Sequence, residues 1–155
     1  MRFWMGAAAA AVGVLVACGD SATEGGCNDF DLTITETRGD TVVTASGLRY
    51  LTVMEGDGQP VTSCDRVRGV TVGFVLDTDS PFVRTPVSFR PGAGEVIRGL
   101  EEGVIGMRVT GQRTLIIPPE LAFGDNEGRN AAGEVIIPAN STVRFEVVVQ
   151  SVVAD

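Results

Sequence analysis

The chain has 155 residues, 44% of them hydrophobic, and carries a formal net charge of −8. This length suits one domain with one core, and the acidic balance argues against nucleic acid as a partner. The sequence has no histidine, which excludes nucleophile–histidine pairs, histidine-ligated metals and an imidazole general base. We expect no metal and no cofactor.

The first 17 residues have the pattern of an export signal. Arg2 provides a short positive region, and residues 3–17 are apolar but too short to span a bilayer comfortably; the segment ends in LVAC at residues 15–18. These letters resemble the lipobox of bacterial lipoproteins, which implies that residues 1–17 are a signal peptide and that Cys18 is lipidated. The alternative is an ordinary signal peptide with a chance cysteine. The expected location is the bacterial cell envelope, anchored to a membrane on the periplasmic side or at the cell surface.

Residues 18–30 are expected to tether the lipid to a domain, because they are mainly small, polar and acidic. If Cys18 carries lipid, Cys27 and Cys64 remain as an even pair in an exported protein. A disulfide between them is one interpretation. Two free thiols are the other, since the sequence does not report the geometry that a disulfide needs.

From residue 31 onward the pattern is mainly that of β-strands. Candidate strands fall in residues 31–37, 41–45, 47–58, 69–77, 87–94, 108–119 and 141–152. In the fourth candidate, apolar residues alternate and predict one shared face: Val70, Val72, Phe74 and Leu76. Residues 120–138 are predicted to be mostly loop.

One short helix is predicted within residues 95–107, which read EVIRGLEEGVIGM. Apolar residues recur there at helical spacing and predict a buried face: Val96, Leu100, Val104 and Met107. Glu101 and Glu102 are predicted to face outward. Strands, then one helix, then more strands predict an α+β fold, an antiparallel half-barrel packed on that helix, over residues 31–155.

Three glycines inside this helical pattern need an explanation, because each costs about 1 kcal/mol relative to alanine in a helix. Gly99, Gly103 and Gly106 lie three and four residues apart and would share one flat side. A flat side lets a helix approach a neighbour closely, and the predicted neighbour is the curved sheet. The alternative is that the glycines merely weaken a loop-like helix.

Three motifs in order carry a resemblance to a known family. They are GEVIRGLEEGVIGMRVTGQR, IIPPELAFG and VIIPANSTVRFEVVV, and SGLRYLTVMEGDG precedes them as a first strand. Together they resemble the FKBP-type peptidyl-prolyl cis-trans isomerases over roughly residues 46–153. The resemblance implies a curved antiparallel sheet wrapped around one short helix, which accounts for the glycines.

The resemblance also implies a proline-binding pocket. Leu100 would take its floor, often a tryptophan in the family, Ile97 would anchor the peptide through its backbone N–H, and Phe82 and Phe123 would form walls. Further substrate-binding positions are Val72, Val83, Val87, Val96, Ile136, Ile137 and Phe145. Ungapped alignment puts Val72 and Val83 where the family usually has a tyrosine and an aspartate. Val87 replaces a common phenylalanine, and Phe123 a usual tyrosine.

The function implied is isomerisation of X-Pro bonds in proteins that fold outside the cytoplasm, without acid, base or metal. Loss of the tyrosine and aspartate predicts weak turnover. A non-catalytic module that holds apolar or proline-containing segments is the alternative, and a purely structural lipoprotein with no open pocket is a third possibility. Expected partners are proline-containing unfolded or exported polypeptides and, through the anchor, a membrane. The chain is expected to be a monomer.

Overall fold

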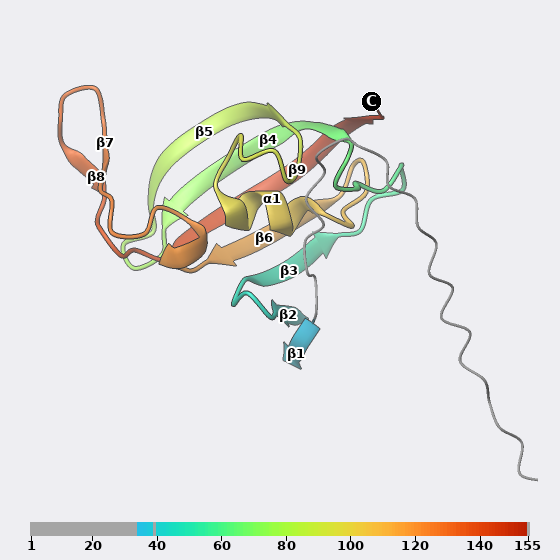
Figure 1. Ribbon diagram of the computed structural model, residues 1–155, viewed down its shortest axis with the longest axis horizontal. Coiled ribbons are helices and arrows are strands. Elements are labelled where there is room, and N and C mark those ends of the chain that lie inside the picture. The colour runs from blue at the N-terminus through green and yellow to red at the C-terminus, as the bar shows by residue number, and fades with distance from the viewer. Residues whose placement is uncertain (1–33, 39, 155) are drawn as a thin grey trace, which may run out of the picture.

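The computed structural model describes residues 34–38 and 40–154. In this part of the chain, seven antiparallel strands form one sheet in the order β1-β2-β3-β6-β9-β4-β5. The strands are β1 (Ile34–Arg38), β2 (Thr41–Thr44), β3 (Arg49–Met54), β4 (Arg66–Val75), β5 (Ser80–Phe89), β6 (Gln112–Ile117) and β9 (Val143–Val153). The sheet curves around one α-helix, α1 (Arg98–Val104) (Figure 1). The predicted α+β half-barrel is therefore confirmed.

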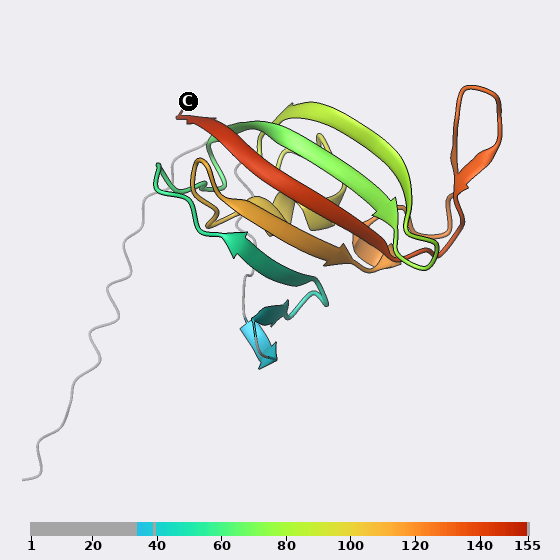
Figure 2. The ribbon, with the colours of Figure 1, turned by 180° about the vertical axis from the view of Figure 1, so that it is seen from behind.

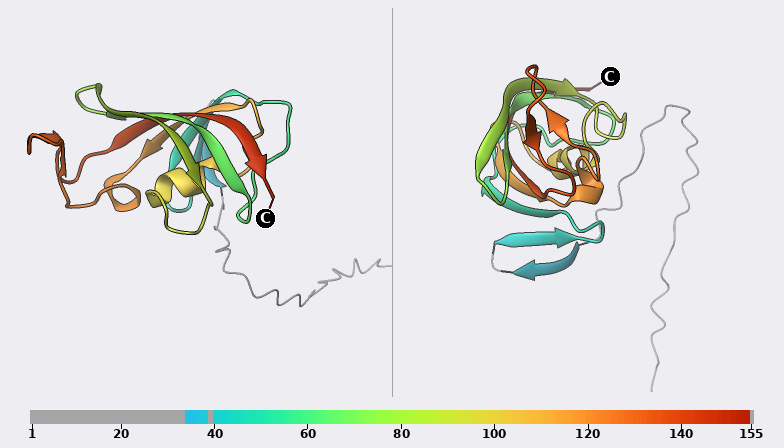
Figure 3. Two further views of the ribbon diagram at one scale, coloured as in Figure 1. Left: turned by 90° about the horizontal axis from the view of Figure 1, so that it is seen from above. Right: turned by 90° about the vertical axis from the view of Figure 1, so that its left-hand side faces the viewer.

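The region predicted as loop holds short structure of its own. A 3-10 helix, η1 (Pro119–Leu121), is followed by a hairpin of β7 (Gly128–Arg129) and β8 (Val135–Ile137). This hairpin projects from one end of the sheet, as the views from above and from the side show (Figure 3). Strand β5 begins at Ser80, seven residues before the predicted start at Val87. The view from behind shows the uncovered convex face, where the long strands β4, β5 and β9 lie side by side (Figure 2).

The core lies between α1 and the concave face of the sheet. Its buried side chains come from the helix and from alternate positions of the strands, including Val67, Val75, Leu100, Val104, Leu115, Ile117, Phe145 and Val147. On β4 the buried residues are the odd-numbered ones. The predicted face of Val70, Val72, Phe74 and Leu76 is therefore the half-buried convex side, where Arg144 stacks on Phe74 at 4.3 Å.

Two of the helical glycines have the predicted use. A Cβ atom on Gly103 would lie 2.5 Å from Cδ1 of Leu115, and one on Gly99 would collide with Cγ2 of Ile117. Both contacts are made to β6, so the glycines let α1 lie close against the sheet. Gly106 is different: it follows the helix, a Cβ there would meet nothing within 4 Å, and its φ of +75° favours glycine.

The prediction that Glu101 and Glu102 face outward was wrong. Their exposed fractions are 3% and 2%. Oε1 of Glu102 accepts hydrogen bonds from the Thr44 and Ser46 hydroxyls, both at 2.7 Å. The carboxylate therefore ties the helix to the connection between β2 and β3, from which it is separated by more than fifty residues.

The last turn of α1 is capped by Arg113 of β6. Its Nη1 donates to the carbonyl oxygens of Gly103 at 2.7 Å and Ile105 at 3.1 Å, and the guanidinium stacks on Tyr50 at 4.3 Å. Burial lowers the pKa of Arg113, while the charges of Tyr50 and Glu55 act in the opposite direction. A cation here satisfies carbonyl groups that a helix end leaves without partners.

The predicted signal peptide, the lipidation of Cys18 and the tether lie outside the described residues. Cys64 lies between Val61 and β4 and is disulfide-bonded. Because Cys27 is not described, its pairing with Cys64 stays a prediction. None of the helices in the described ranges is long and apolar enough to cross a membrane.

Candidate functional site

A cleft of about 310 Å³ opens between the amino-terminal end of α1 and the concave side of β4, β5 and β9. Its lining residues are Thr71, Phe82, Val83, Thr85, Val87, Val96, Ile97, Leu100, Phe123, Ile137 and Phe145. The structure thus brings together every residue predicted for the proline-binding pocket except Val72 and Ile136. The lining is apolar apart from two threonines, which suits a small apolar group such as a proline ring.

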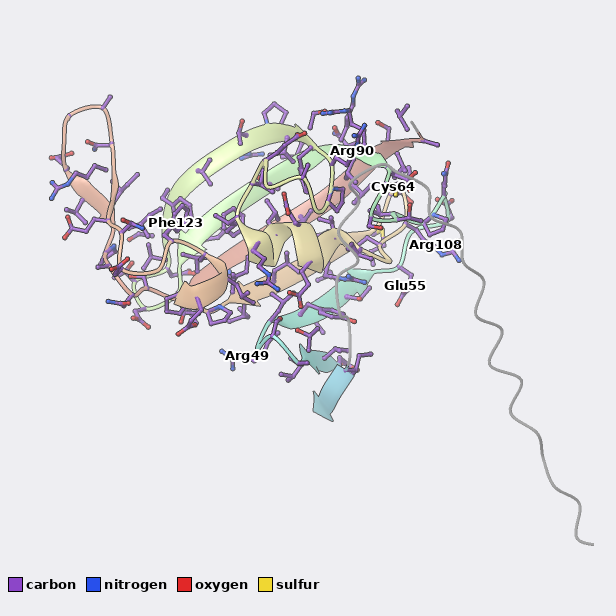
Figure 4. The ribbon with its side chains drawn as sticks, viewed as in Figure 1. Arg49, Glu55, Cys64, Arg90, Arg108 and Phe123 are labelled. Atoms are coloured by element: carbon purple, nitrogen blue, oxygen red, sulfur yellow. The ribbon has the colours of Figure 1, made fainter. Side chains whose placement is uncertain are left out.

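The aromatic walls are built around Phe82. Its ring lies edge-on to Phe123, with centroids 6.1 Å apart, and edge-on to Phe145, with centroids 5.6 Å apart. Edge-to-face contacts of this kind stabilise aromatic pairs and fix ring orientation. Leu100 closes the cleft from the helix side and is only 3% exposed, so it belongs to both the core and the lining. Phe123 lies at the end of the molecule away from Cys64 and Arg90 (Figure 4).

Two neighbouring residues of β5 line the cleft, although a regular strand would point them to opposite faces. The ladder with β4 shifts register here, since Gly73 pairs with Val83 and Phe74 pairs with Pro81. Phe82 is the extra residue of this β-bulge. A bulge re-aims side chains, which allows Phe82 and Val83 to face the same space.

The register of β4 corrects one predicted site residue. Thr71 faces the cleft and is 1% exposed, whereas Val72 pairs with Arg84 and Glu146 on the convex side. The ungapped alignment had to cross the turn after β4 and the bulge at Phe82. One extra residue in such a segment shifts the alignment of β4 by one position, and each aligned side chain then falls on the opposite face of the sheet. Thr71 therefore takes the place that the resemblance assigns to a tyrosine.

Ile136 is the second predicted residue outside the cleft. It lies next to Ile137 on β8 and lines a separate hollow on the far side of that strand. Both threonines of the lining, Thr71 and Thr85, were absent from the predicted site residues. Thr85 alternates with Val83 and Val87 on β5, so a strand extended back from residue 87 would have found it, whereas Thr71 required the register of β4.

Ile97 is the N-cap residue that directly precedes α1. Its carbonyl oxygen accepts from the N–H groups of Leu100 and Glu101, at 3.0 and 3.2 Å, and its backbone is extended, with φ −60° and ψ 143°. Its own N–H has no hydrogen-bond partner among the described residues. This donor, beside an apolar cleft, is available to a peptide carbonyl.

The loop that leads into Ile97 is held by the buried carboxylate of Glu101. Oε2 accepts the Gly92 N–H at 3.2 Å, and Oε1 accepts the Glu95 N–H at 3.0 Å. Hydrogen bonds to a charged acceptor are stronger than neutral ones. Glu101 therefore fixes the path of residues 92–96 and with it the position of Val96 and Ile97.

The fold is a half-barrel with one helix, and its cleft is an apolar site of a size that suits a proline ring. The family model described as FKBP-type peptidyl-prolyl cis-trans isomerase matches residues 48–150. The chain belongs to this family, which confirms the predicted enzyme class. No group of three or more histidine, cysteine or acidic side chains that could hold a metal occurs within residues 34–38 and 40–154.

Individual relatives agree with this assignment. The chain is 40% identical over 96 residues to "FK506-binding protein" of Streptomyces anulatus, covering 59% of this chain and 75% of that protein. It is 44% identical over 97 residues to "FK506-binding protein 4" of Chaetomium thermophilum, again over 59% of this chain but only 18% of that protein. The crystal structure of AtFKBP13 from Arabidopsis thaliana superposes with a TM-score of 0.64 at 30% identity, over 72% of this chain and 97% of that one.

Proposed function

We propose that this chain catalyses cis–trans isomerisation of X-Pro bonds in exported polypeptides. The observation that carries the proposal is the position of the Ile97 N–H, without a partner in the described chain, at the mouth of a cleft whose walls are aromatic and whose floor is Leu100. A proline ring would enter the cleft. The N–H would hold the flanking peptide by one of its carbonyl oxygens.

The chemistry needs no proton transfer. Rotation about an X-Pro bond meets a barrier of about 18–20 kcal/mol, which amide resonance sets. The twisted amide has less charge separation than the planar one, and water stabilises the planar form. An apolar cleft withdraws that stabilisation, so it lowers the relative free energy of the twisted state.

Turnover should be slow for a domain of this family. Val83 and Phe123 face the cleft where the resemblance places an aspartate and a tyrosine, so two polar groups are missing, whereas Thr71 keeps a hydroxyl at the other tyrosine position. Each lost polar contact is worth about 1–2 kcal/mol, and about 1.4 kcal/mol of transition-state stabilisation changes a rate tenfold. Two lost contacts therefore remove about one to three orders of magnitude.

A protease-coupled assay with a proline tetrapeptide tests this proposal. The purified full chain should raise the rate of cis-to-trans conversion in proportion to its concentration, above the uncatalysed rate. Affinity for an unfolded client should be measured beside it. Binding without turnover would favour the alternative function, a holdase for apolar or proline-containing segments, which the missing polar contacts support.

We further propose that Cys18 carries lipid and holds the domain at a membrane of the cell envelope. The support is the LVAC sequence after an apolar segment. Two or three acyl chains anchor a protein stably, whereas one gives only marginal binding. Radioactive palmitate should label the wild type in a bacterial host and leave Cys18→Ser unlabelled; an unlabelled wild type contradicts the proposal.

The proposed disulfide between Cys27 and Cys64 would join the end of the tether to the domain. Its support is that Cys64 is disulfide-bonded, together with the even pair of cysteines that remains after lipidation. The bridge would close a loop of about 36 residues, and closing a loop of that length stabilises a fold by about 3–4 kcal/mol if the effect comes from the entropy of the unfolded chain. Titration of the unfolded, unreduced protein should find neither cysteine as a free thiol, and two reactive thiols would exclude the bridge.

A further inference from the structure

The segment of residues 90–97 joins β5 to α1 and ends at the Ile97 N–H, the donor that the proposed function uses (Figure 1). The middle of this segment is weakly constrained by its own residues. Residues 93–95 are exposed, and Gly92 and Gly94 have positive φ angles of +89° and +72°. Glycine has more backbone freedom than any other residue, so the segment needs a restraint from outside to keep one conformation.

The side chain of Glu101 provides such a restraint from α1. Its Oε2 atom accepts a hydrogen bond from the Gly92 N–H at 3.2 Å, and its Oε1 atom accepts one from the Glu95 N–H at 3.0 Å. These two donors flank Ala93 and Gly94, so the carboxylate holds the exposed part of the segment from both sides. Glu101 is itself only 3% exposed, and hydrogen bonds to a charged acceptor are stronger than neutral ones.

The direction of the Ile97 N–H depends on the path of this segment. A peptide N–H lies in the plane that joins its residue to the residue before it, which here is Val96. The hydrogen bonds that α1 makes to Ile97 go instead to its carbonyl oxygen, from the N–H groups of Leu100 and Glu101. The helix therefore fixes one side of Ile97, and the carboxylate of Glu101 fixes the other side through the segment.

Arg66 also reaches the segment, but more weakly. Its Nη2 atom lies 3.5 Å from Oε1 of Glu95, in an ion pair whose side chains are 35% and 39% exposed. Exposed ion pairs contribute little, because water weakens the attraction and ordering two long side chains costs entropy. The two hydrogen bonds to the buried carboxylate of Glu101 are therefore the stronger restraint.

We propose that Glu101 is a positioning residue of the isomerase, which directs the Ile97 N–H toward the peptide without touching the substrate. Glu101 is not among the residues that line the cleft. The inference rests on the proposed function, because it needs a polypeptide that this N–H holds. The N–H would hold a flanking carbonyl oxygen in both the planar and the twisted form of the X-Pro bond. An interaction made equally in the ground state and the transition state lowers KM without raising kcat.

Substitution of Glu101 tests the inference through the separate effects on KM and kcat. Glu101→Ala should raise KM for a proline tetrapeptide about three- to tenfold, the usual effect of losing one neutral hydrogen bond, and should change kcat by less than about twofold. The dissociation constant of the same peptide should rise with KM. Glu101→Gln keeps the size of the side chain, but its carboxamide accepts at only one of its two terminal atoms, so KM should rise by a smaller factor.

Glu102 supplies a matched control. It is the next residue of α1, it is 2% exposed, and its Oε1 atom accepts from the hydroxyl groups of Thr44 and Ser46, which do not line the cleft. Glu102→Ala should also lower the urea unfolding midpoint, because each alanine leaves buried donors without their acceptor, but its KM should stay at the wild-type value. If Glu101→Ala does not fold, Glu101→Gln and Glu102→Gln carry the same comparison.

A second measurement does not depend on turnover. At saturating peptide, the shift of the Ile97 amide resonance should be smaller in Glu101→Ala than in the wild type and unchanged in Glu102→Ala. Wild-type KM and Ile97 shift in Glu101→Ala, or an equal rise of KM in Glu102→Ala, overturn the positioning role alone. A wild type that binds without turnover contradicts the isomerase, and the dissociation constant then replaces KM in the comparison. Neither binding nor turnover overturns both.

Discussion

Leu100→Asp should abolish X-Pro turnover and peptide binding together. Leu100 is the floor of the cleft and is 3% exposed, so the variant places a carboxylate where the proline ring should rest. An ionised group taken from water without a partner costs several kcal/mol, and a bound apolar ring would exclude the remaining water. We expect a loss of at least about 100-fold in kcat/KM, equivalent to about 2.7 kcal/mol.

Two further variants separate an effect on the site from a loss of folding. Leu100→Trp places the family's usual side chain on the floor and should keep or raise turnover. Val83→Arg changes a half-buried residue at the cleft rather than in the core, so it should block the site while circular dichroism and the unfolding midpoint stay near wild type. If Leu100→Asp and Val83→Arg both keep wild-type turnover, the cleft is only packing and the functional proposal fails.

Gly103→Ala should destabilise the protein by about 1–3 kcal/mol, the usual cost of forcing an extra methyl group into a packed core. The added Cβ would lie 2.5 Å from Leu115, a side chain that is 0% exposed. Helix propensity alone predicts the opposite sign, a gain of about 1 kcal/mol. Urea unfolding therefore decides whether close packing on β6 or helix propensity dominates.

Arg98→Ala provides the control for this prediction. Arg98 is exposed in the first turn of the same helix, and the substitution should change the unfolding free energy by less than about 0.5 kcal/mol. A Gly103→Ala protein that is more stable than the wild type would show that α1 does not rest on the sheet as closely as described.

The close packing of α1 on the sheet could be predicted from sequence because it depends on the spacing of glycines within one short segment. Gly99 and Gly103 are four residues apart, and a helix turns that spacing into one flat side. The burial of Glu101 and Glu102 could not be read in this way. Their partners are backbone N–H groups of a neighbouring loop and hydroxyls more than fifty residues away, which sequence periodicity does not report.

The cleft was predicted well where ordered motifs placed it and poorly where strand register mattered. Leu100, Ile97 and Phe123 lie in continuous matching segments and line the site. Val72 was misplaced because the segment between it and Phe82 contains a turn and a bulge, whose lengths the residues do not reveal. The separate hollow beside Ile136 depends on the same segment together with β8, so no sequence signal pointed to it.

The most direct test of the central claim is a two-dimensional NMR exchange experiment on an Ala-Pro peptide, with the full chain added in substoichiometric amount. Exchange cross-peaks between the cis and trans forms should appear on a timescale where the free peptide, which exchanges in tens to hundreds of seconds, shows none. Excess peptide should also shift the backbone amide resonance of Ile97. A peptide spectrum without exchange, together with an unmoved Ile97 amide, would contradict that claim.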